Sequence, residues 1–215
     1  MNYSNKLLAL LLITVNFVCT DMPWHVPAIF AQDNDKITAA FKNSYTNEYA
    51  AEYTKAIQNM KEVYAADNYE INLRLGWLHY MGGLFTESQT YYQTAMNLRP
   101  YSIEAKFGYV YPAAALGNWE QVKKQYMDIL KIDANNTTAL YRLGLIYYGA
   151  EDYMKAFTNF EKVVNLYPFD YNSLLMLAWS NFKLGKTRES KILFQKVLWA
   201  SPSDASALEG LGYIK

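Results

Sequence analysis

The chain has 215 residues, of which 52% are hydrophobic, and its 20 basic and 20 acidic side chains give a formal net charge of zero. This length accommodates one domain or two small ones, with enough apolar material for a core. The charge balance argues against a nucleic-acid binder, because such proteins carry a basic excess that neutralises phosphates. A single cysteine, Cys19, excludes a disulfide framework and a zinc ribbon. The composition is also rich in aromatic residues, with 20 Tyr, 10 Phe and 5 Trp.

Residues 1–31 have the pattern of a secretory signal segment. Lys6 precedes an uncharged apolar run at residues 7–15, which is too short to span a bilayer, since that takes about 20 apolar residues. We expect cleavage between Ala31 and Gln32; the alternative is an uncleaved, loosely anchored N-terminus. Lipid attachment at Cys19 is disfavoured because Val18 precedes it where a small residue is needed. Cleavage would leave a chain without cysteine, without redox chemistry and without stable membrane insertion.

A regular period runs through the rest of the chain. Several columns of similar residues recur at a step of 34 or of twice 34. They include Gly76, Gly144 and Gly212; Gly83, Gly117 and Gly185; Leu75, Tyr109, Leu143, Leu177 and Leu211; and the rings Tyr92, Tyr126, Phe160 and Phe194. We expect these four rings to belong to the core.

Each unit of the period is expected to contain two amphipathic helices, because apolar residues recur at steps of three and four. Strong N-cap residues open the first helix of successive units, namely Asn68, Ser102, Asn136, Asp170 and Asp204. Asn118 and Asp152 are candidate caps for second helices. Glycine near the middle of the unit allows a tight turn, and proline near its end stops the second helix.

This pattern resembles the tetratricopeptide repeat family, whose unit is a helix–turn–helix of about 34 residues. The match is dense at Leu75, Gly76, Gly83, Phe85, Tyr92, Ala95 and Pro100, and again at Leu143, Gly144, Tyr147, Tyr153, Ala156, Phe160 and Pro168. The resemblance implies an all-α, right-handed superhelical solenoid of antiparallel helix pairs, with about five units and a C-terminal capping helix. We expect a single solenoid domain over residues 32–215. Its units are a degenerate one at 34–68, then 69–102, 103–136, 137–170 and 171–204, with a terminal helix at 205–215.

Two units depart from the pattern. Val110 stands where the family usually has a small glycine or alanine. In the first unit, Phe41 lies one full period before Leu75, whereas Met60 precedes Tyr92 by a step of only 32. We therefore expect the turn between the two helices of the first unit to be two residues longer than in the others, and the exit from its second helix to be two residues shorter.

The sequence offers little support for catalysis. Without residues 1–31, one histidine (His79) and no cysteine remain, and the chain has no HExxH, phosphate-binding glycine loop or GxSxG motif. We expect His79 to be packed within the fold. No ligand spacing for a metal is present. We therefore expect a protein that is not an enzyme and has no cofactor and no metal site.

Recognition is the remaining chemistry, and the family resemblance places a concave groove along the first helices. Its columns are mostly aromatic, with acids and two arginines beside them. The predicted partner-binding residues are Glu70, Leu73, Arg74, Trp77, Tyr80, Glu104, Phe107, Tyr111, Tyr141, Arg142, Tyr148, Trp179 and Phe182. Such rings offer wide contact area at low entropic cost.

The leading hypothesis is a non-enzymatic scaffold that binds a peptide or protein segment in this groove. The signal segment would place it outside the cytoplasm, in the periplasm or beyond the cell, with a Gram-negative bacterium as the expected source. One alternative is an envelope glycan binder that stacks sugars on exposed Trp and Tyr faces. Another is a self-assembling protein whose partner is a second copy of itself.

Overall fold

The computed structural model describes residues 28–214, and this part of the chain is entirely helical. Eleven helices follow one another in it without an intervening strand. In chain order they are α1 (Ala28–Tyr49), α2 (Tyr53–Lys61), α3 (Tyr69–Met81), α4 (Phe85–Leu98), α5 (Ile103–Ala115), α6 (Trp119–Ile132), α7 (Thr137–Gly149), α8 (Tyr153–Leu166), α9 (Tyr171–Lys183), α10 (Thr187–Ala200) and α11 (Ala205–Tyr213). The all-α solenoid of helix pairs predicted from the sequence is confirmed.

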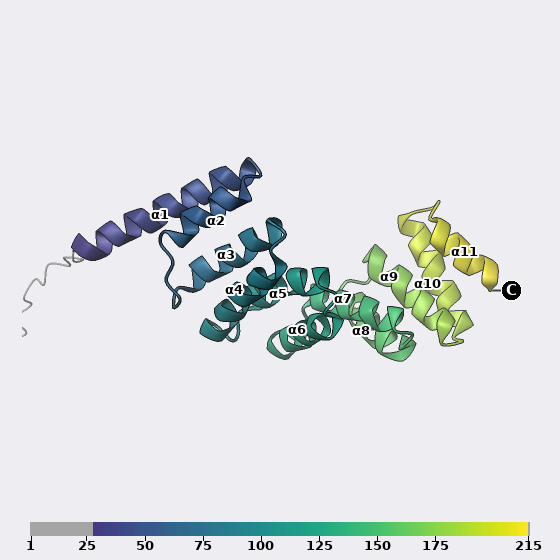
Figure 1. Ribbon diagram of the computed structural model, residues 1–215. Helices are drawn as coiled ribbons and strands as arrows, with labels where there is room; N and C mark the ends of the chain where they lie inside the picture. The colour runs from purple at the N-terminus through teal and green to yellow at the C-terminus, as the bar shows by residue number, and fades with distance from the viewer. Residues whose placement is uncertain (1–27, 215) are drawn as a thin grey trace, which may run out of the picture.

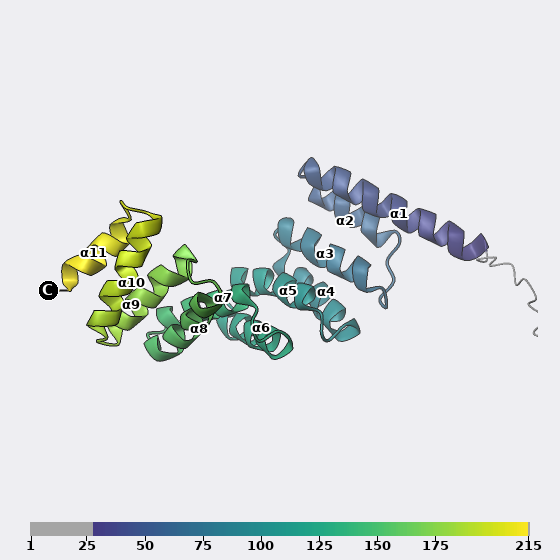
Figure 2. The same cartoon turned by 180° about the vertical axis from the view of Figure 1, so that it is seen from behind.

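The helices form five pairs in a row, and α11 stands alone at the C-terminal end (Figure 1). The regularity is close: α3, α5, α7 and α9 each have 13 residues, and α4, α6, α8 and α10 each have 14. First helices of neighbouring pairs also meet, as α3 meets α5 and α7 meets α9. The view from behind shows the same row from α1 to α11 (Figure 2). Each pair therefore contacts mainly its neighbours, as in a solenoid.

The predicted signal segment falls mostly on residues 1–27, outside the described residues, and stays a prediction. Helix α1 begins at Ala28, ahead of the expected cleavage point after Ala31. Within residues 28–214, no helix combines the length and apolar character that crossing a membrane would require.

Side-chain caps open the first helix of each complete unit, as predicted. Asn68 Oδ1, for example, accepts a hydrogen bond from the backbone N–H of Ile71 at 2.9 Å. The side chains of four further residues also accept a hydrogen bond from the backbone N–H three positions later, namely Ser102, Asn136, Asp170 and Asp204. Asp152 caps α8 in this way. Asn118 precedes α6 but makes no side-chain capping bond, so the predicted cap there is wrong.

The ring of Tyr92 shows why the glycine and ring columns share one period. It is 3% exposed and lies between Gly76 of α3 and Gly108 of α5. A Cβ atom added at Gly76 would lie 2.9 Å from the ring, and one added at Gly108 would lie 2.1 Å from it. Both helices therefore approach the ring at a distance that a larger residue would prevent. The predicted core role is confirmed for all four rings of the column, Tyr92, Tyr126, Phe160 and Phe194.

Tyr126 packs differently from the other three rings. Phe160 has Gly144 against its face, and Phe194 has Gly210, whereas the two positions that correspond around Tyr126 hold Val110 and Arg142. Helix α7 makes less contact with α6 than α5 makes with α4. The larger residues thus coincide with the loosest junction between complete units, and a cavity lies there.

Both helices of the first unit lie 32 residues, instead of 34, before the equivalent positions of the second unit. Its turn spans residues 50–52, which matches the three-residue turn at 82–84 in the next unit. The prediction of a longer turn is therefore wrong. Helix α1 ends at Tyr49 and α3 ends at Met81, an offset of 32 that also separates Met60 from Tyr92. Both helices are displaced together. The step from Met60 to the Asn68 cap is 8, against 10 from Tyr92 to the Ser102 cap, so the predicted shorter exit is found.

The middle residue of each turn within a pair has a left-handed backbone conformation. Glycine occupies it in three turns, with φ of 73° at Gly117. In the other two turns the residues are Ala51 (φ 57°) and Glu151 (φ 61°). A side chain in this region costs about 1–2 kcal/mol relative to the right-handed helical region, so these two turns carry a strain that the glycine turns avoid.

We expect Glu151→Gly to raise the free energy of unfolding by about 1 kcal/mol, because the relief of strain exceeds the entropic cost of glycine. Gly117→Ala should lower it by a similar amount, because no atom lies within 4 Å of an added Cβ and only the φ value opposes it. Urea denaturation measures both changes. Gly149→Ala, in a helix and equally open, is the control and should not destabilise; destabilisation by Glu151→Gly would contradict the prediction.

His79 is packed, as predicted, with 2% of its surface exposed. Its Nδ1–H donates to the Leu75 carbonyl at 2.7 Å, and its ring lies 4.7 Å from that of Tyr91. Burial lowers the pKa of His79 below its ordinary value, and the Lys61 charge adds to this, against opposing effects of the Leu75 bond and Glu87. The folded chain therefore takes up this proton less readily than the unfolded chain.

It follows that the fold loses stability as the pH falls below the unfolded histidine pKa of about 6.5. The loss reaches at most about 1.4 kcal/mol per pH unit. Urea denaturation of the wild type and of His79→Gln at pH 7.5 and 5.5 isolates this contribution. We expect the variant to lose less stability than the wild type over that interval, and equal losses would refute the assignment.

Candidate partner-binding groove

Two pockets adjoin along one edge of α5. The first, the α1–α3–α5 pocket, has a volume of about 710 Å³. It is lined by Phe41, Tyr45, Tyr69, Glu70, Leu73, Arg74, Trp77, Tyr92, Arg99, Glu104, Phe107, Gly108 and Tyr111. The second, the α5–α7 pocket, has a volume of about 1150 Å³ and extends over α5, α6 and α7. Phe107 and Tyr111 line both pockets, so the two form one continuous groove.

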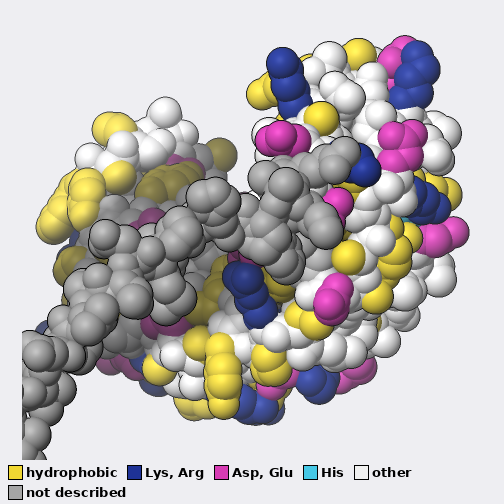
Figure 3. Space-filling view, turned by 90° about the vertical axis from the view of Figure 1, so that its left-hand side faces the viewer, with side chains coloured by type: hydrophobic (Ala, Val, Ile, Leu, Met, Phe, Trp, Pro, Cys, Tyr) yellow, Lys and Arg dark blue, Asp and Glu magenta, His cyan; other side chains and the backbone are white. Residues whose placement is uncertain are grey.

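The surface around these helices carries mixed charge. Lys and Arg side chains stand beside Asp and Glu across the face seen from the α1 end, with hydrophobic side chains between them (Figure 3). No broad field of one sign dominates that view.

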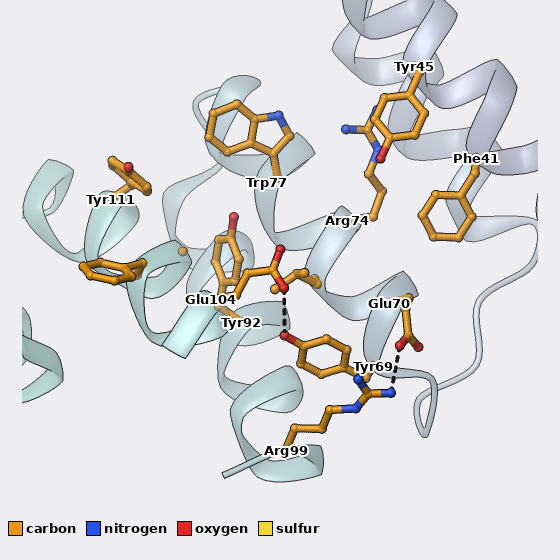
Figure 4. A pocket seen from close by; sticks show the side chains of 13 residues that line it. Phe41, Tyr45, Tyr69, Glu70, Arg74, Trp77, Tyr92, Arg99, Glu104 and Tyr111 are labelled. Carbon is orange, nitrogen blue, oxygen red and sulfur yellow. Dashed lines mark hydrogen bonds and ion pairs between the residues drawn. The ribbon is translucent and has the colours of Figure 1, made fainter. Parts of the chain in front are cut away.

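Arg74 is held at the wall of the α1–α3–α5 pocket by three contacts. Its Nη1 lies 2.6 Å from Glu48 Oε2, and its Nε donates to Ser44 Oγ at 3.1 Å. Its guanidinium stacks over the Tyr45 ring at 3.8 Å from the ring centre (Figure 4). The side chain is 6% exposed, yet its buried Nη2 has no hydrogen-bond partner among the described residues. Leaving such a donor unpaired costs free energy, so Nη2 is a buried donor that lacks an acceptor at this pocket wall.

Two carboxylates stand at the same pocket in different electrostatic states. Glu70 is paired with Arg99 at 2.8 Å, across the pocket rim. Glu104 is exposed and makes no ion pair in the described part of the chain; its Oε2 accepts a hydrogen bond from the Tyr69 hydroxyl at 3.4 Å (Figure 4). Burial raises the pKa of Tyr69 above its ordinary value, so the hydroxyl, protonated at neutral pH in any case, keeps its proton further into alkaline solution.

Aromatic rings form the wall that leads from one pocket to the other. Trp77 lies 5.8 Å from Tyr80 and 6.4 Å from Tyr111, ring centre to ring centre, and its Nε1–H donates to Glu48 at 2.5 Å. Tyr80 and Tyr111 are 5.5 Å apart. Tyr111 is 50% exposed, which makes it the ring of this cluster best placed for a partner to contact.

The α5–α7 pocket contains the opposite unpaired charge. Lys123 is paired with Glu120 at 2.8 Å, and Lys155 with Asp152 at 2.6 Å. Arg142 is exposed and makes no ion pair within residues 28–214. The two halves of the groove therefore differ: Glu104 leaves one with a free negative charge, and Arg142 leaves the other with a free positive charge.

Most of the predicted groove residues gather in these pockets, but those of the later units do not. The residues brought together are Glu70, Leu73, Arg74, Trp77, Tyr80, Glu104, Phe107, Tyr111 and Arg142. Tyr141 and Tyr148 line neither pocket and pack edge-on against the Phe160 and Tyr153 rings. The rings of Trp179 and Phe182 pack against α11. Trp179 Nε1–H donates to Ser206 Oγ at 2.8 Å, and both rings contact the ring of Tyr213.

Two lining residues on α1 escaped the sequence analysis because the first unit was aligned at the wrong step. At a step of 34, Phe41 and Tyr45 fall into the columns of Leu75 and His79, which are core positions. At the step of 32 shown by Met60, they fall into the columns of Leu73 and Trp77. Applying that offset to both helices would have found them. Trp119, 57% exposed, lines the α5–α7 pocket from the second helix of its unit, where no groove column was expected.

The chain matches known tetratricopeptide repeats in sequence and in structure. The tetratricopeptide repeat family model matches residues 138–170 and 172–204. A tetratricopeptide repeat protein from Parabacteroides merdae ATCC 43184 is similar in structure, with a TM-score of 0.71, 21% identity and coverage of 84% of this chain and 72% of that one. A structure of MamA has a TM-score of 0.68 and 20% identity, and the match covers 80% of this chain and 95% of that one. MamA 41-end from Desulfovibrio magneticus RS-1 has a TM-score of 0.66 and 19% identity, with coverage of 80% of this chain and 98% of that one.

The resemblance seen in the sequence is thereby confirmed. Residues 138–170 and 172–204 are tetratricopeptide repeats, and the described chain as a whole has the tetratricopeptide repeat fold. The structural matches lie at about one-fifth identity, so they establish the architecture shared with these proteins.

We expect Glu48→Gln to lower the free energy of unfolding by about 2–4 kcal/mol, because it leaves the buried charge of Arg74 without a counter-ion. Glu70→Gln is the matched control: both partners of the Glu70–Arg99 pair are more than half exposed, and the loss should stay below about 1 kcal/mol. Urea denaturation at pH 7.5 measures both. Equal losses would contradict the structural role assigned to Glu48.

Proposed function

We propose that this chain is a non-catalytic scaffold that binds an extended segment of a partner protein in the groove formed by the two adjoining pockets. The observation that carries the proposal is the shared edge of Phe107 and Tyr111, which joins the two pockets into one groove. A continuous groove accommodates a chain better than a compact ligand. Tetratricopeptide repeats are compatible with a role in protein–protein interaction.

The composition of the groove supports a peptide as its occupant. Its walls are apolar and aromatic, with Tyr111 exposed, and aromatic anchors dominate binding energy in protein interfaces. Charged groups interrupt these walls. Most are paired with one another, whereas Glu104 and Arg142 make no ion pair among the described residues and Arg74 Nη2 has no acceptor there. This combination of apolar side-chain contacts with a few placed polar groups suits an extended segment.

We place this interaction in the cell envelope of a bacterium, with the periplasm as the expected compartment. The support comes from the sequence: Lys6 followed by the uncharged apolar run at 7–15 has the pattern of an export signal. Detecting the mature N-terminus by mass spectrometry in an osmotic-shock fraction would test this part of the proposal by itself.

A random peptide-display selection against the purified full chain tests the binding function. We expect enriched peptides, and we expect Tyr111→Ser to weaken them about tenfold, because this ring contributes to both pockets. Tyr167→Ser is the control, since Tyr167 is 60% exposed and lines neither pocket.

Other occupants give different results in matched assays. Binding to an oligosaccharide array without binding to any peptide would contradict the proposal in favour of a glycan ligand. Oligomers that sediment faster in the wild type and are lost in Tyr111→Ser would show that the groove is filled by a second copy of the chain.

A further inference from the structure

We propose that the α1–α3–α5 pocket selects a segment in which a large apolar side chain stands next to a lysine or arginine. Arg74 Nη2 would hold a main-chain carbonyl of the segment, and Glu104 would hold the basic side chain. This inference rests on the proposed function and specifies which segment the groove takes.

The first step is the acceptor for Arg74. Contacts with Glu48, Ser44 and Tyr45 fix its guanidinium, so Nη2 keeps a constant position at the pocket wall. A neutral acceptor suits it better than an anion. Glu48 already balances the Arg74 charge, and the carboxylates of Glu70 and Glu104 line the same pocket. A main-chain carbonyl is a neutral acceptor that every residue of an extended segment carries.

The second step is the cation for Glu104. Two ion pairs stand at this pocket, Arg74 with Glu48 and Arg99 with Glu70. The carboxylate of Glu104 is a third negative charge, and no cation of the pocket pairs with it. The Tyr69 hydroxyl bonds to Ser102 Oγ at 2.7 Å and lies 3.4 Å from Oε2 of this carboxylate, so it leaves Glu104 available to a cation. A further pocket of about 510 Å³, lined by Arg99, Pro100, Tyr101, Ser102, Tyr69 and Glu104, adjoins it. A long basic side chain thus has both a counter-ion and room.

The third step is the apolar anchor. Between Arg74 and Glu104 the pocket walls are Leu73, Trp77 and Phe107. The close approach of Gly108 to the Tyr92 ring draws α5 against the base of the pocket. A volume of about 710 Å³ is ample for a leucine or an aromatic side chain together with its main chain. The anchor supplies affinity, and the exposed charge of Glu104 supplies selectivity.

Fluorescence anisotropy with labelled peptides and the purified full chain tests this inference. The probes are blocked eleven-residue Gly/Ser peptides with a central Leu or Phe and with Lys, Gln or Glu on either side of it. We expect the Lys peptides to bind about three- to fivefold more tightly than the Gln peptides at low salt. The Glu peptides should bind most weakly, and a salt concentration of about 500 mM should reduce these differences.

Two charge variants assign the selectivity to one carboxylate. Glu104→Gln should remove the difference in affinity between Lys and Gln peptides, because the counter-ion of the Lys side chain is lost. Glu120→Gln, the same chemical change at an exposed, paired carboxylate of the neighbouring pocket, should preserve the Lys preference. No Lys preference in the wild type, or a preference that survives Glu104→Gln, would overturn this inference and leave the proposed function standing.

Arg74→Lys tests the carbonyl contact separately. Lysine keeps a positive charge beside Glu48 but has no second nitrogen to reach the bound segment. We expect about tenfold weaker binding of all peptides with the Lys-to-Gln ratio retained, measured on protein shown to be folded by its thermal transition. Wild-type affinity in folded Arg74→Lys would overturn the role of Nη2. If neither these peptides nor display-selected ones bind the wild type, the proposed function itself is contradicted.

Discussion

The packing of one ring against small residues on two helices is the constraint on which this solenoid depends. Tyr92 touches Gly76 on its own unit and Gly108 on the next, so a single side chain closes the helix pair and also docks its neighbour. Close packing of this kind leaves little tolerance for added volume. Ring and glycine return together at Tyr92, Phe160 and Phe194, and this packing favours a constant repeat length.

The groove lies where this constraint is relaxed. The position of Gly108 against Tyr92 is filled by Arg142 at the Tyr126 junction, and by Arg74 at the junction with the first unit. Neither side chain permits the approach that glycine allows. Each arginine lines the pocket at its own junction, whereas Gly210 closes the last junction against Phe194. At these two junctions, an arginine in the packing column thus lines a pocket and brings a charge to it.

The architecture could be predicted from the sequence because the chain repeats. Recurring aromatic rings, N-cap residues and glycines mark the packing side, the start and the turn of each helix pair. The site was only partly readable. Trp179 occupies a groove column, yet the short α11 covers it, and Trp179 bonds to Ser206. The position of a residue in the repeat predicts which face of its helix carries the side chain. It does not predict whether the following helix covers that face. Arg74 was expected in the groove, and its burial against Glu48 depends on the register of α1, which the sequence analysis misplaced.

That register explains why the degenerate unit contributes to the site. With the offset of 32, Ser44 falls in the small-residue column of Gly76 and is fully buried, while Tyr45 falls in the groove column of Trp77 and is 48% exposed. Ser44 and Tyr45 are therefore adjacent on α1 but face in different directions, and both contact Arg74. At an offset of 34 the column of Gly76 would hold Lys42, and its burial beside Arg74 would be unfavourable. The offset of 32 thus removes a repulsion and supplies the acceptor and the ring that hold the guanidinium with one nitrogen free.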